Sequence, residues 1–113
     1  MTYVIGKECI DAQDRSCVDV CPVDCIYEGS RKNYINPAEC IDCGECELVC
    51  PAVAIFPARK ATNDEWKQFT ADNAAFFTEQ HPGQDAPLGD PGGAEPLGSV
   101  DADTPLVAGW PQR

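Results

Sequence analysis

Basic residues are scarce in this chain of 113 residues, which has 8 Lys and Arg against 19 Asp and Glu and a formal net charge of -11. This balance excludes binding to nucleic acid or to an anionic membrane through a broad basic face, and it favours partners with basic surfaces instead. Apolar runs of about 18 residues, the length that spans a bilayer, are also missing. The N-terminus lacks the charged and apolar regions of a signal peptide. We therefore expect a cytoplasmic monomer with no nucleic-acid and no membrane partner.

Cysteine, in contrast, is abundant, with 8 residues in the chain. A domain this small buries only a modest share of its apolar surface, so we expect something besides hydrophobic burial to hold it together. In a reducing compartment eight thiols are not expected to form four disulfides, and metal binding is the better explanation. The spacing of the cysteines must then indicate which metal group they bind.

An internal repeat organises the first half of the chain. Residues 8–11 recur letter for letter at 39–42, and the Cys-Pro pair at 21–22 recurs at 50–51. Each copy is typical of a short apolar strand, a cysteine loop, a short helix that proline ends, and a second strand. The predicted strands and the hairpin turn between the middle two cover 3–5, 26–28, 33–35 and 54–56, with the turn at 29–32. Two βαβ halves related by a pseudo-twofold axis follow, which predicts a βαββαβ core of the α+β class over residues 1–57.

A C-terminal extension over residues 58–113 is expected to belong to the same domain. Its first part, about 63–80, is predicted to be a helix, with Thr62 as the N-cap and Glu65 reaching back in a capping box. One apolar face of this helix is formed by Trp66, Phe69, Phe76 and Phe77. The tail over 81–113 has six prolines and six glycines, which exclude long regular structure, so it either wraps the core or stays disordered. Apolar anchors favour wrapping, namely Leu88, Leu97, Val100, Leu106, Val107 and Trp110.

Four cysteines of the second copy match the bacterial iron-sulfur run C-x2-C-x2-C-x3-C-P. They are Cys40, Cys43, Cys46 and Cys50, which Pro51 follows. A cubane cluster needs a thiolate at each of its closely spaced iron corners, and a loop that turns every third residue supplies three of them. Structural zinc is the nearest competitor, but its sites usually bring two separated pairs of ligands, which is not the shape of this run. The run therefore predicts an iron-sulfur cluster.

The fourth thiolate of each copy is expected to cross to the other copy, because in two-cluster proteins the cysteine before proline serves the other cluster. One cluster then takes four thiolates, from Cys21, Cys40, Cys43 and Cys46, which predicts a [4Fe-4S] centre. The other takes three, from Cys9, Cys17 and Cys50. Its fourth position holds Ala12, whose methyl group cannot bind iron, so we predict a [3Fe-4S] centre there. The alternative is a complete cube whose fourth iron takes water or a carboxylate, Asp11 or Asp14.

The eighth cysteine, Cys25, has Ala54 as its counterpart in the second copy. A small residue at this place on a strand predicts a buried free thiol that packs as a small hydrophobe. Two alternatives stay open: a replacement ligand, should the neighbouring cluster rearrange, and a redox-sensitive thiol, should the side chain be exposed.

Residues 2–57 closely resemble the bacterial seven-iron ferredoxins. The resemblance rests on the motif Cys9-x7-Cys17-x3-Cys21-Pro22, on the free Cys25 and on the complete run that ends at Cys50-Pro51. Segments 72–77 and 103–107 are similar to the extended ferredoxins of actinobacteria. Zinc-containing relatives carry histidines on an N-terminal extension, whereas His81 is the only histidine here. The resemblance implies a one-electron carrier, not an enzyme, that takes electrons from a ferredoxin reductase or other donor and delivers them to acceptor enzymes such as cytochrome P450s.

Acidic residues flank the predicted four-iron ligands. Asp42, Glu45 and Glu47 are expected to dock basic partner surfaces, with the alternative that they only keep the surface soluble. Two competing functions remain at this point: a regulatory sensor of oxygen or iron, and a zinc or disulfide scaffold with a purely structural role. The sequence contains no recognisable DNA-binding module or output domain that would favour the sensor.

Overall fold

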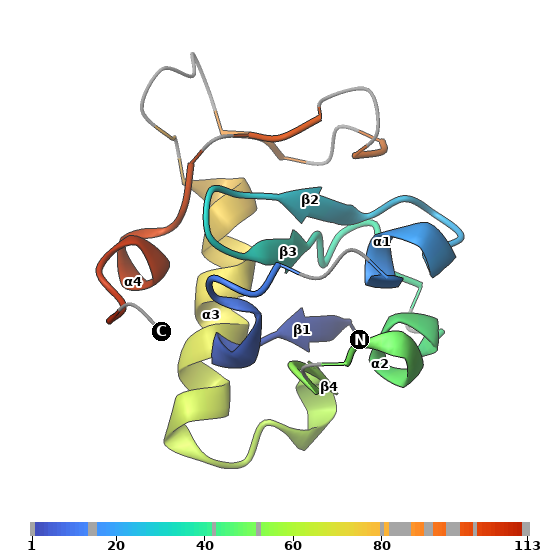
Figure 1. Ribbon diagram of the computed structural model, residues 1–113, viewed down its shortest axis with the longest axis horizontal. Helices are drawn as coiled ribbons and strands as arrows, with labels where there is room; N and C mark the ends of the chain where they lie inside the picture. Colours follow the sequence, from blue (N-terminus) through green and yellow to red (C-terminus); the bar gives the residue numbers. More distant parts are fainter. Residues whose placement is uncertain are drawn as a thin grey trace.

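The computed structural model describes residues 2–13, 16–41, 43–51, 53–79, 81, 87–89, 92–94, 98–100 and 102–111. Short strands and helices alternate, and 3-10 turns (η) join some of them (Figure 1). In chain order the elements are β1 (Tyr3–Ile5), η1 (Lys7–Cys9), α1 (Ser16–Val20), β2 (Ile26–Glu28), β3 (Asn33–Ile35), α2 (Glu45–Val49), β4 (Ile55–Pro57), η2 (Ala58–Lys60), α3 (Asp64–Thr78) and α4 (Pro105–Ala108). The predicted mixture of helices and strands is thus confirmed, and the last strand begins one residue later than expected. Every helix of the described residues is too short or too polar to cross a bilayer.

The four strands form two antiparallel ladders. β1 pairs with β4, with Val4 opposite Phe56, and β2 pairs with β3, with Tyr27 opposite Tyr34. The predicted turn closes the second ladder, since the Gly29 N–H donates to the Lys32 carbonyl at 2.9 Å. The first ladder joins residues 50 to 54 positions apart, so it holds the two copies of the repeat together.

Alternation along the strands divides the interior into two layers, because successive side chains of a strand point to opposite faces. One face meets the cysteines and forms what we call the sulfur layer, with Tyr3, Ile5, Ile26, Ile35 and Ile55. The other face forms the aromatic layer, with Val4, Tyr27, Tyr34 and Phe56 packed on the phenylalanines of α3. The strands therefore separate the side that carries the cysteines from α3, which covers the opposite side.

Helix α3 lies against β1 and β3 and closes the aromatic layer. Its inward face carries Phe69, Asp72, Asn73, Phe76 and Phe77. The Phe76 ring stacks on Tyr34 with 3.8 Å between centroids. Asn73 also accepts a hydrogen bond from the Ile35 N–H at 3.0 Å and donates one to the Ile35 carbonyl. The helix is thus fixed to β3 by both packing and hydrogen bonds.

The start of α3 differs from the prediction. Asn63, not Thr62, is the N-cap, and its Oδ1 accepts the Trp66 N–H at 2.8 Å. Both residue types cap helices well, so local preference does not choose between them. The choice is tertiary, because Trp66 stacks on Phe56 at 4.1 Å between centroids and fixes the rotation of the helix. Glu65, expected in a capping box, instead pairs with a lysine of η1 at 3.1 Å.

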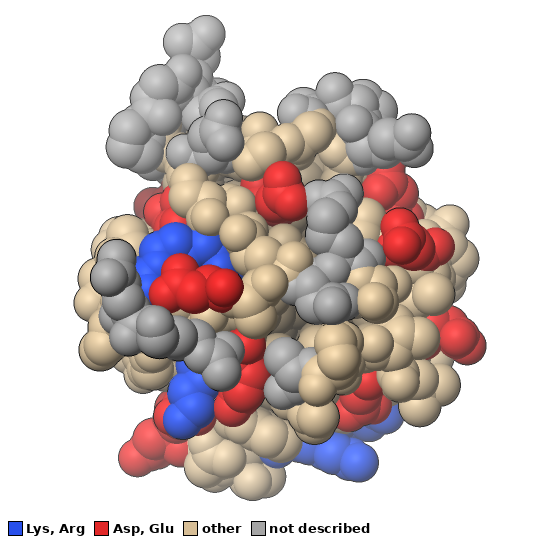
Figure 2. All heavy atoms as spheres, viewed as in Figure 1, with Lys and Arg blue, Asp and Glu red and all other residues tan. Residues whose placement is uncertain are grey.

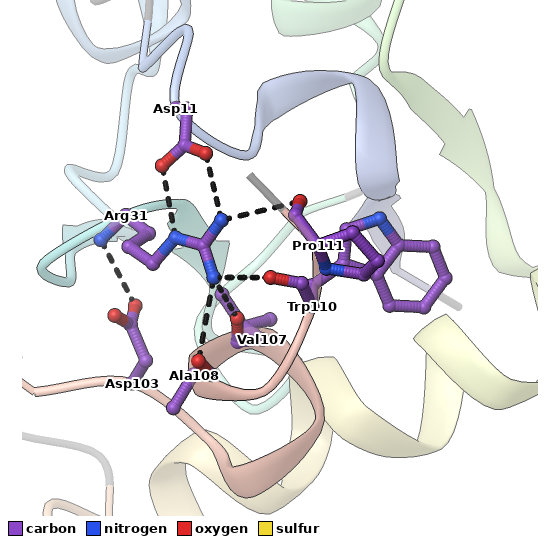
Figure 3. A network of polar contacts seen from close by, with 7 residues as sticks. All are labelled: Asp11, Arg31, Asp103, Val107, Ala108, Trp110 and Pro111. Atoms are coloured by element: carbon purple, nitrogen blue, oxygen red, sulfur yellow. Dashed lines mark hydrogen bonds and ion pairs between the residues drawn. The ribbon is translucent and has the colours of Figure 1, made fainter. Parts of the chain in front are cut away.

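The described part of the tail lies on the core, held by Arg31 in the hairpin turn (Figure 3). The guanidinium donates to both carboxylate oxygens of Asp11 at 2.9 and 2.7 Å. It also donates to the carbonyls of Val107, Ala108, Trp110 and Pro111, which include the last turn of α4. Val107 is fully buried and the Trp110 ring packs edge-on against Phe69. These contacts agree with a wrapping tail, and the predicted anchor Leu97 lies outside the described residues.

Candidate metal centres

Two short helices position most of the cysteines. α1 and α2 pack against each other on the side of the strands opposite α3 (Figure 1). Each helix carries one buried cysteine, Cys17 or Cys46, and each is followed by a Cys-Pro pair that ends it, at Cys21 or Cys50. One cysteine from each helix region, Cys21 after α1 and Cys46 in α2, lines the hollow described below, whereas Cys17 and Cys50 do not.

Gly44 begins α2 in a left-handed conformation, with φ of 81°. A Cβ at this position would lie 2.9 Å from the hydroxyl of Tyr3. Both the backbone and the space therefore require glycine here, and the turn that it permits brings Cys43 and Cys46 to the same side of the loop.

Five thiols line one hollow of the sulfur layer. Four of them, all except Cys25, are what we call the four-thiol group. They are Cys21, Cys40, Cys43 and Cys46. The remaining wall is mostly apolar, with Tyr3, Val23, Ile26, Ile35 and Ile41. These are the four cysteines that the repeat predicts for a [4Fe-4S] centre, and the structure brings them around a common space.

Cys9, Cys17 and Cys50 lie near one another in the same layer, and we call them the three-thiol group. The charges of Cys9 and Cys50 both act on the Cys17 thiol. Cys9 is buried and accepts a hydrogen bond from the Asn33 N–H, with 3.5 Å between nitrogen and sulfur. These are the three cysteines that the sequence predicts for a [3Fe-4S] centre.

Burial disfavours the thiolate form of three of these cysteines, Cys9, Cys17 and Cys46. It raises the pKa of both Cys17 and Cys46 to about 12, and the charges of neighbouring thiols add to the shift. Burial also raises the pKa of Cys9, against the Asn33 N–H and the charge of Lys32. Thiolates crowded in this way need a cationic group to neutralise them.

The donor set fits iron-sulfur clusters. All eight cysteines are free thiols. Among the described residues, no three Cys, His, Asp or Glu side chains converge closely enough to hold a single metal ion. The thiols of the four-thiol group instead line a hollow, as the ligands of a multi-iron cluster do, and cysteine thiolates are the usual ligands of such clusters. Holding the clusters would fall to the three-thiol and four-thiol groups.

The position at which the sequence predicts a missing fourth ligand for the three-thiol group lies in the loop before α1. Ala12 is exposed there, and its side chain offers no ligand atom. Asp11, one of the two carboxylates considered for the fourth iron, is bound through both oxygens to Arg31. It would have to break this bidentate pair to reach a metal. The other carboxylate, Asp14, lies outside the described residues.

Cys25 is 2 % exposed, so its predicted burial is confirmed. Its surroundings are less apolar than expected, since its Sγ lies 3.4 Å from that of Cys21. A hydrogen bond with Cys40, burial and a hydrogen bond with Cys21 raise the pKa of the Cys25 thiol. The hollow of the four-thiol group therefore has a fifth thiol in its wall. The counterpart residue Ala54 gave no indication of this, because it reports the size of the site and not its neighbours.

The surface beside the four-thiol group is apolar and acidic. Large exposed apolar side chains are gathered within residues 41–53 in the described chain, and they form what we call the apolar patch: Ile41, Leu48, Val49 and Val53. Glu45 and Glu47 of α2 are exposed among them, and Asp42 lies outside the described residues. Figure 2 shows acidic side chains over α1 and α2, whereas basic side chains gather at the left and the bottom of this view. Sequence reasoning identified the acids but missed the apolar patch, which only burial can reveal.

The chain is similar to known proteins over nearly its whole length. A family model described as "4Fe-4S binding domain" matches residues 33–56, a segment that includes the complete cysteine run of the second copy. A protein named "Ferredoxin" from Mycobacterium tuberculosis (strain ATCC 25618 / H37Rv) is 56% identical over 111 residues, which cover 98% of this chain and 96% of that protein. A "Ferredoxin" from Streptomyces griseus is 50% identical over 112 residues, covering 99% and 98%. A "Ferredoxin 7Fe" from Hydrogenibacillus schlegelii is 52% identical over 77 residues, covering 68% of this chain and 97% of the relative.

Proposed function

Because the chain belongs to the ferredoxin family, whose members are iron-sulfur electron carriers and not enzymes, we propose that it carries single electrons on one [3Fe-4S] and one [4Fe-4S] cluster. The observation that carries this proposal is the unequal division of the thiols into a group of three and a group of four, with Ala12 at the missing corner. The relative named "Ferredoxin 7Fe" supports the proposal, because seven is the number of irons in one three-iron and one four-iron cluster.

The proposed ligands follow the two groups. Cys9, Cys17 and Cys50 hold the three-iron cluster, and Cys21, Cys40, Cys43 and Cys46 hold the four-iron cluster. A bound cluster of either kind supplies a one-electron couple, and the chain tunes it through burial, charge and hydrogen bonds to sulfur. The charge of Cys17 acts on Cys46 across the contact of α1 with α2, so the two groups adjoin. This proximity supports electron exchange between the clusters.

The two-cluster βαββαβ core is proposed to cover residues 1–57, with 58–113 as an extension of the same domain. The packing of α3 on β1 and β3 supports this division, as does the bond of Arg31 to the tail. We take the working form to be a cytoplasmic monomer, in keeping with the net charge of -11.

The cluster assignment is tested by iron, acid-labile sulfide and EPR on anaerobically purified protein. We expect seven irons per chain and the signal of an oxidised three-iron centre. Cys21→Ala is expected to damage the four-iron centre first and to keep that signal, whereas Cys17→Ala, four residues away at the start of the same helix, abolishes it. Eight irons with no three-iron signal would contradict the proposal, as would loss of the three-iron signal on Cys21→Ala alone.

The proposed docking surface is the apolar patch with Glu45 and Glu47. Cys43 of the four-thiol group is itself exposed beside it, which gives electrons a short exit path. Its partners are redox proteins with an apolar contact surface rimmed by Lys and Arg, such as a ferredoxin reductase as donor and a cytochrome P450 as acceptor. Leu48, 79 % exposed at the end of α2, has no packing role that would explain an apolar side chain there.

Leu48→Ser tests this surface with a purified NADPH-dependent ferredoxin reductase. We expect the KM for the carrier to rise about fivefold, the size of effect of a moderate interface residue, with kcat and both reduction potentials unchanged. Ala71→Ser, on the exposed side of α3, is the control and leaves the KM unchanged. An unaltered KM in the Leu48 variant would exclude the apolar patch as a contact surface for this partner.

A further inference from the structure

Lys32 is fully buried, at 0 % exposure, next to β3. Its Nζ donates to the main-chain oxygens of Ile5 at 2.8 Å and Asn33 at 3.1 Å, and it lies 4.1 Å from the centroid of the Tyr34 ring. All of these partners are neutral, so the lysine is hydrogen-bonded but its charge is not balanced by contact with a carboxylate. Burial accordingly lowers the pKa of Lys32 to about 8. An unbalanced buried charge is costly and calls for a counter-charge.

The counter-charges available to Lys32 point to the three-thiol group. Cys9 is the strongest of the charges that raise the pKa of the lysine, ahead of Asp72 and Asp103. Asp72 is buried, and burial raises the pKa of its carboxyl, which weakens it as an anion. Asp103 uses its Oδ1 to accept the Tyr34 hydroxyl at 2.9 Å. Neither carboxylate hydrogen-bonds to the ammonium.

Main-chain contacts connect the lysine with the sulfur of Cys9. Asn33 accepts a hydrogen bond from Lys32 through its carbonyl, and its N–H donates to the Cys9 Sγ. The buried cation and the N–H donor thus act on the same thiol from the same stretch of β3. The charges that act most strongly on Cys46, in the four-thiol group, are in contrast those of other thiols. The two groups therefore differ in their electrostatic surroundings.

We infer that Lys32 is the counter-charge of the cluster bound by the three-thiol group and raises the reduction potential of that cluster above the value it would have without the lysine. The inference rests on the proposed function. Three thiolates make the cluster site anionic, and the electron delivered by a partner adds one more negative charge with no bond formed or broken. A buried cation stabilises the more negative, reduced form more than the oxidised form. Lys32 is thus a positioning residue for charge and not a ligand.

The experiment uses the complete protein with its clusters and follows both centres in an EPR-monitored redox titration. Lys32→Met removes the charge and the donors, and Lys32→Gln removes the charge but keeps a donor for the Ile5 carbonyl. Lys7→Met is the matched control, because it removes a lysine two residues before Cys9 that is 42 % exposed and paired with Glu65. Iron content is measured first, and absence of the clusters from the unmodified protein would refute the proposed function itself.

At a fixed solution potential, the ratio of reduced to oxidised three-iron centre is expected to be about tenfold lower in both Lys32 variants. This equals a lowering of the reduction potential by about 59 mV for a one-electron couple. The reduction potential of the four-iron centre in the Lys32 variants is expected to shift by less than half of this. The same limit is expected for the three-iron centre in the Lys7 variant. The Met variant is expected to fold, because replacing a buried charge with an apolar chain is often neutral for stability, and the Gln variant gives a second reading if it does not. Loaded Lys32 variants with an unshifted three-iron potential would overturn the inference, as would an equal shift in the Lys7 variant or a wild-type potential in the Gln variant.

Discussion

Asp24 and Val53 occupy equivalent places in the two copies of the repeat, 29 residues apart, and share a left-handed backbone with φ of 52° and 53°. Asp tolerates this conformation, whereas a β-branched residue is strained in it. Val53 is also 80 % exposed, so packing does not repay the strain. A strained, exposed valine in the apolar patch does not add stability, and the proposed contact with a partner would account for it.

Val53→Asn is therefore expected to leave the free energy of unfolding unchanged or to raise it by up to about 1 kcal/mol, since Asn adopts the left-handed region more readily. The same variant should weaken turnover with the reductase. Chemical denaturation of the loaded protein measures the first effect and the KM the second. Ile41→Asn, an exposed site with an ordinary backbone, serves as the comparison and brings no gain in stability. A Val53 variant that unfolds more easily would contradict the strain argument.

The N-cap of α3 tests whether local sequence preference or tertiary contacts determine where the helix begins. Asn63→Ala removes the acceptor for the Trp66 N–H and is expected to cost about 1 kcal/mol, the usual value of an N-cap. Thr62→Ala, at the position that the sequence favours, should cost less than half as much. Thermal unfolding of the two variants in parallel decides the matter, and a larger loss in the Thr62 variant would restore the capping box.

Helix α4 depends on a residue far away in the sequence. Arg31→Met removes donors to four carbonyls of residues 107–111 and breaks the ion pair with Asp11. Hydrogen bonds of a charged group contribute less at a partly exposed site than in the interior, so we expect a modest loss in the free energy of unfolding. Hydrogen exchange should become faster in 105–111 and stay unchanged in α3. Lys60→Met, an exposed basic site on η2, is the control, and slow exchange at 105–111 in the Arg31 variant would count against this role.

Local patterns predicted the elements, and distant contacts decided what the patterns left open. The short strand patterns and the proline stops of α1 and α2 depend on adjacent residues, and each of the four strands lies within one residue of its prediction. α4 was not predicted, because Thr104 as N-cap and Pro105 at the first turn are weak signals in a tail rich in proline and glycine. Its carbonyls are bound by Arg31, and no window of neighbouring residues contains that interaction.

The whole molecule has one layer that needs metal and one that does not. The aromatic layer is closed by α3 through apolar packing, whereas the sulfur layer surrounds cysteines that repel one another once they become thiolates. The cysteine groups could be predicted because ligand spacing is a local property. The burial of Lys32 could not, since a lysine beside a polar turn resembles an exposed residue until the strands and the tail cover it.

Removal of iron by an anaerobic chelator is expected to lower the midpoint of thermal unfolding by at least about 5 °C, because cluster binding contributes to the free energy of folding in a domain of this size. Far-ultraviolet circular dichroism before and after removal, with reductant present in both samples, measures the change. Reductant without chelator is the control. An unchanged midpoint would mean that the aromatic layer alone accounts for the stability.

Because the side chains of each strand alternate between two faces, correct strand pairing and correct placement of the ligands depend on each other. A slip of one residue in any strand would exchange its two faces, and in β2, β3 or β4 it would send a tyrosine or phenylalanine toward the cysteines and an isoleucine toward α3. The thiols of both groups would then be displaced together with the strands that support them. Binding of the full number of irons therefore requires that all four strands are paired in the correct register.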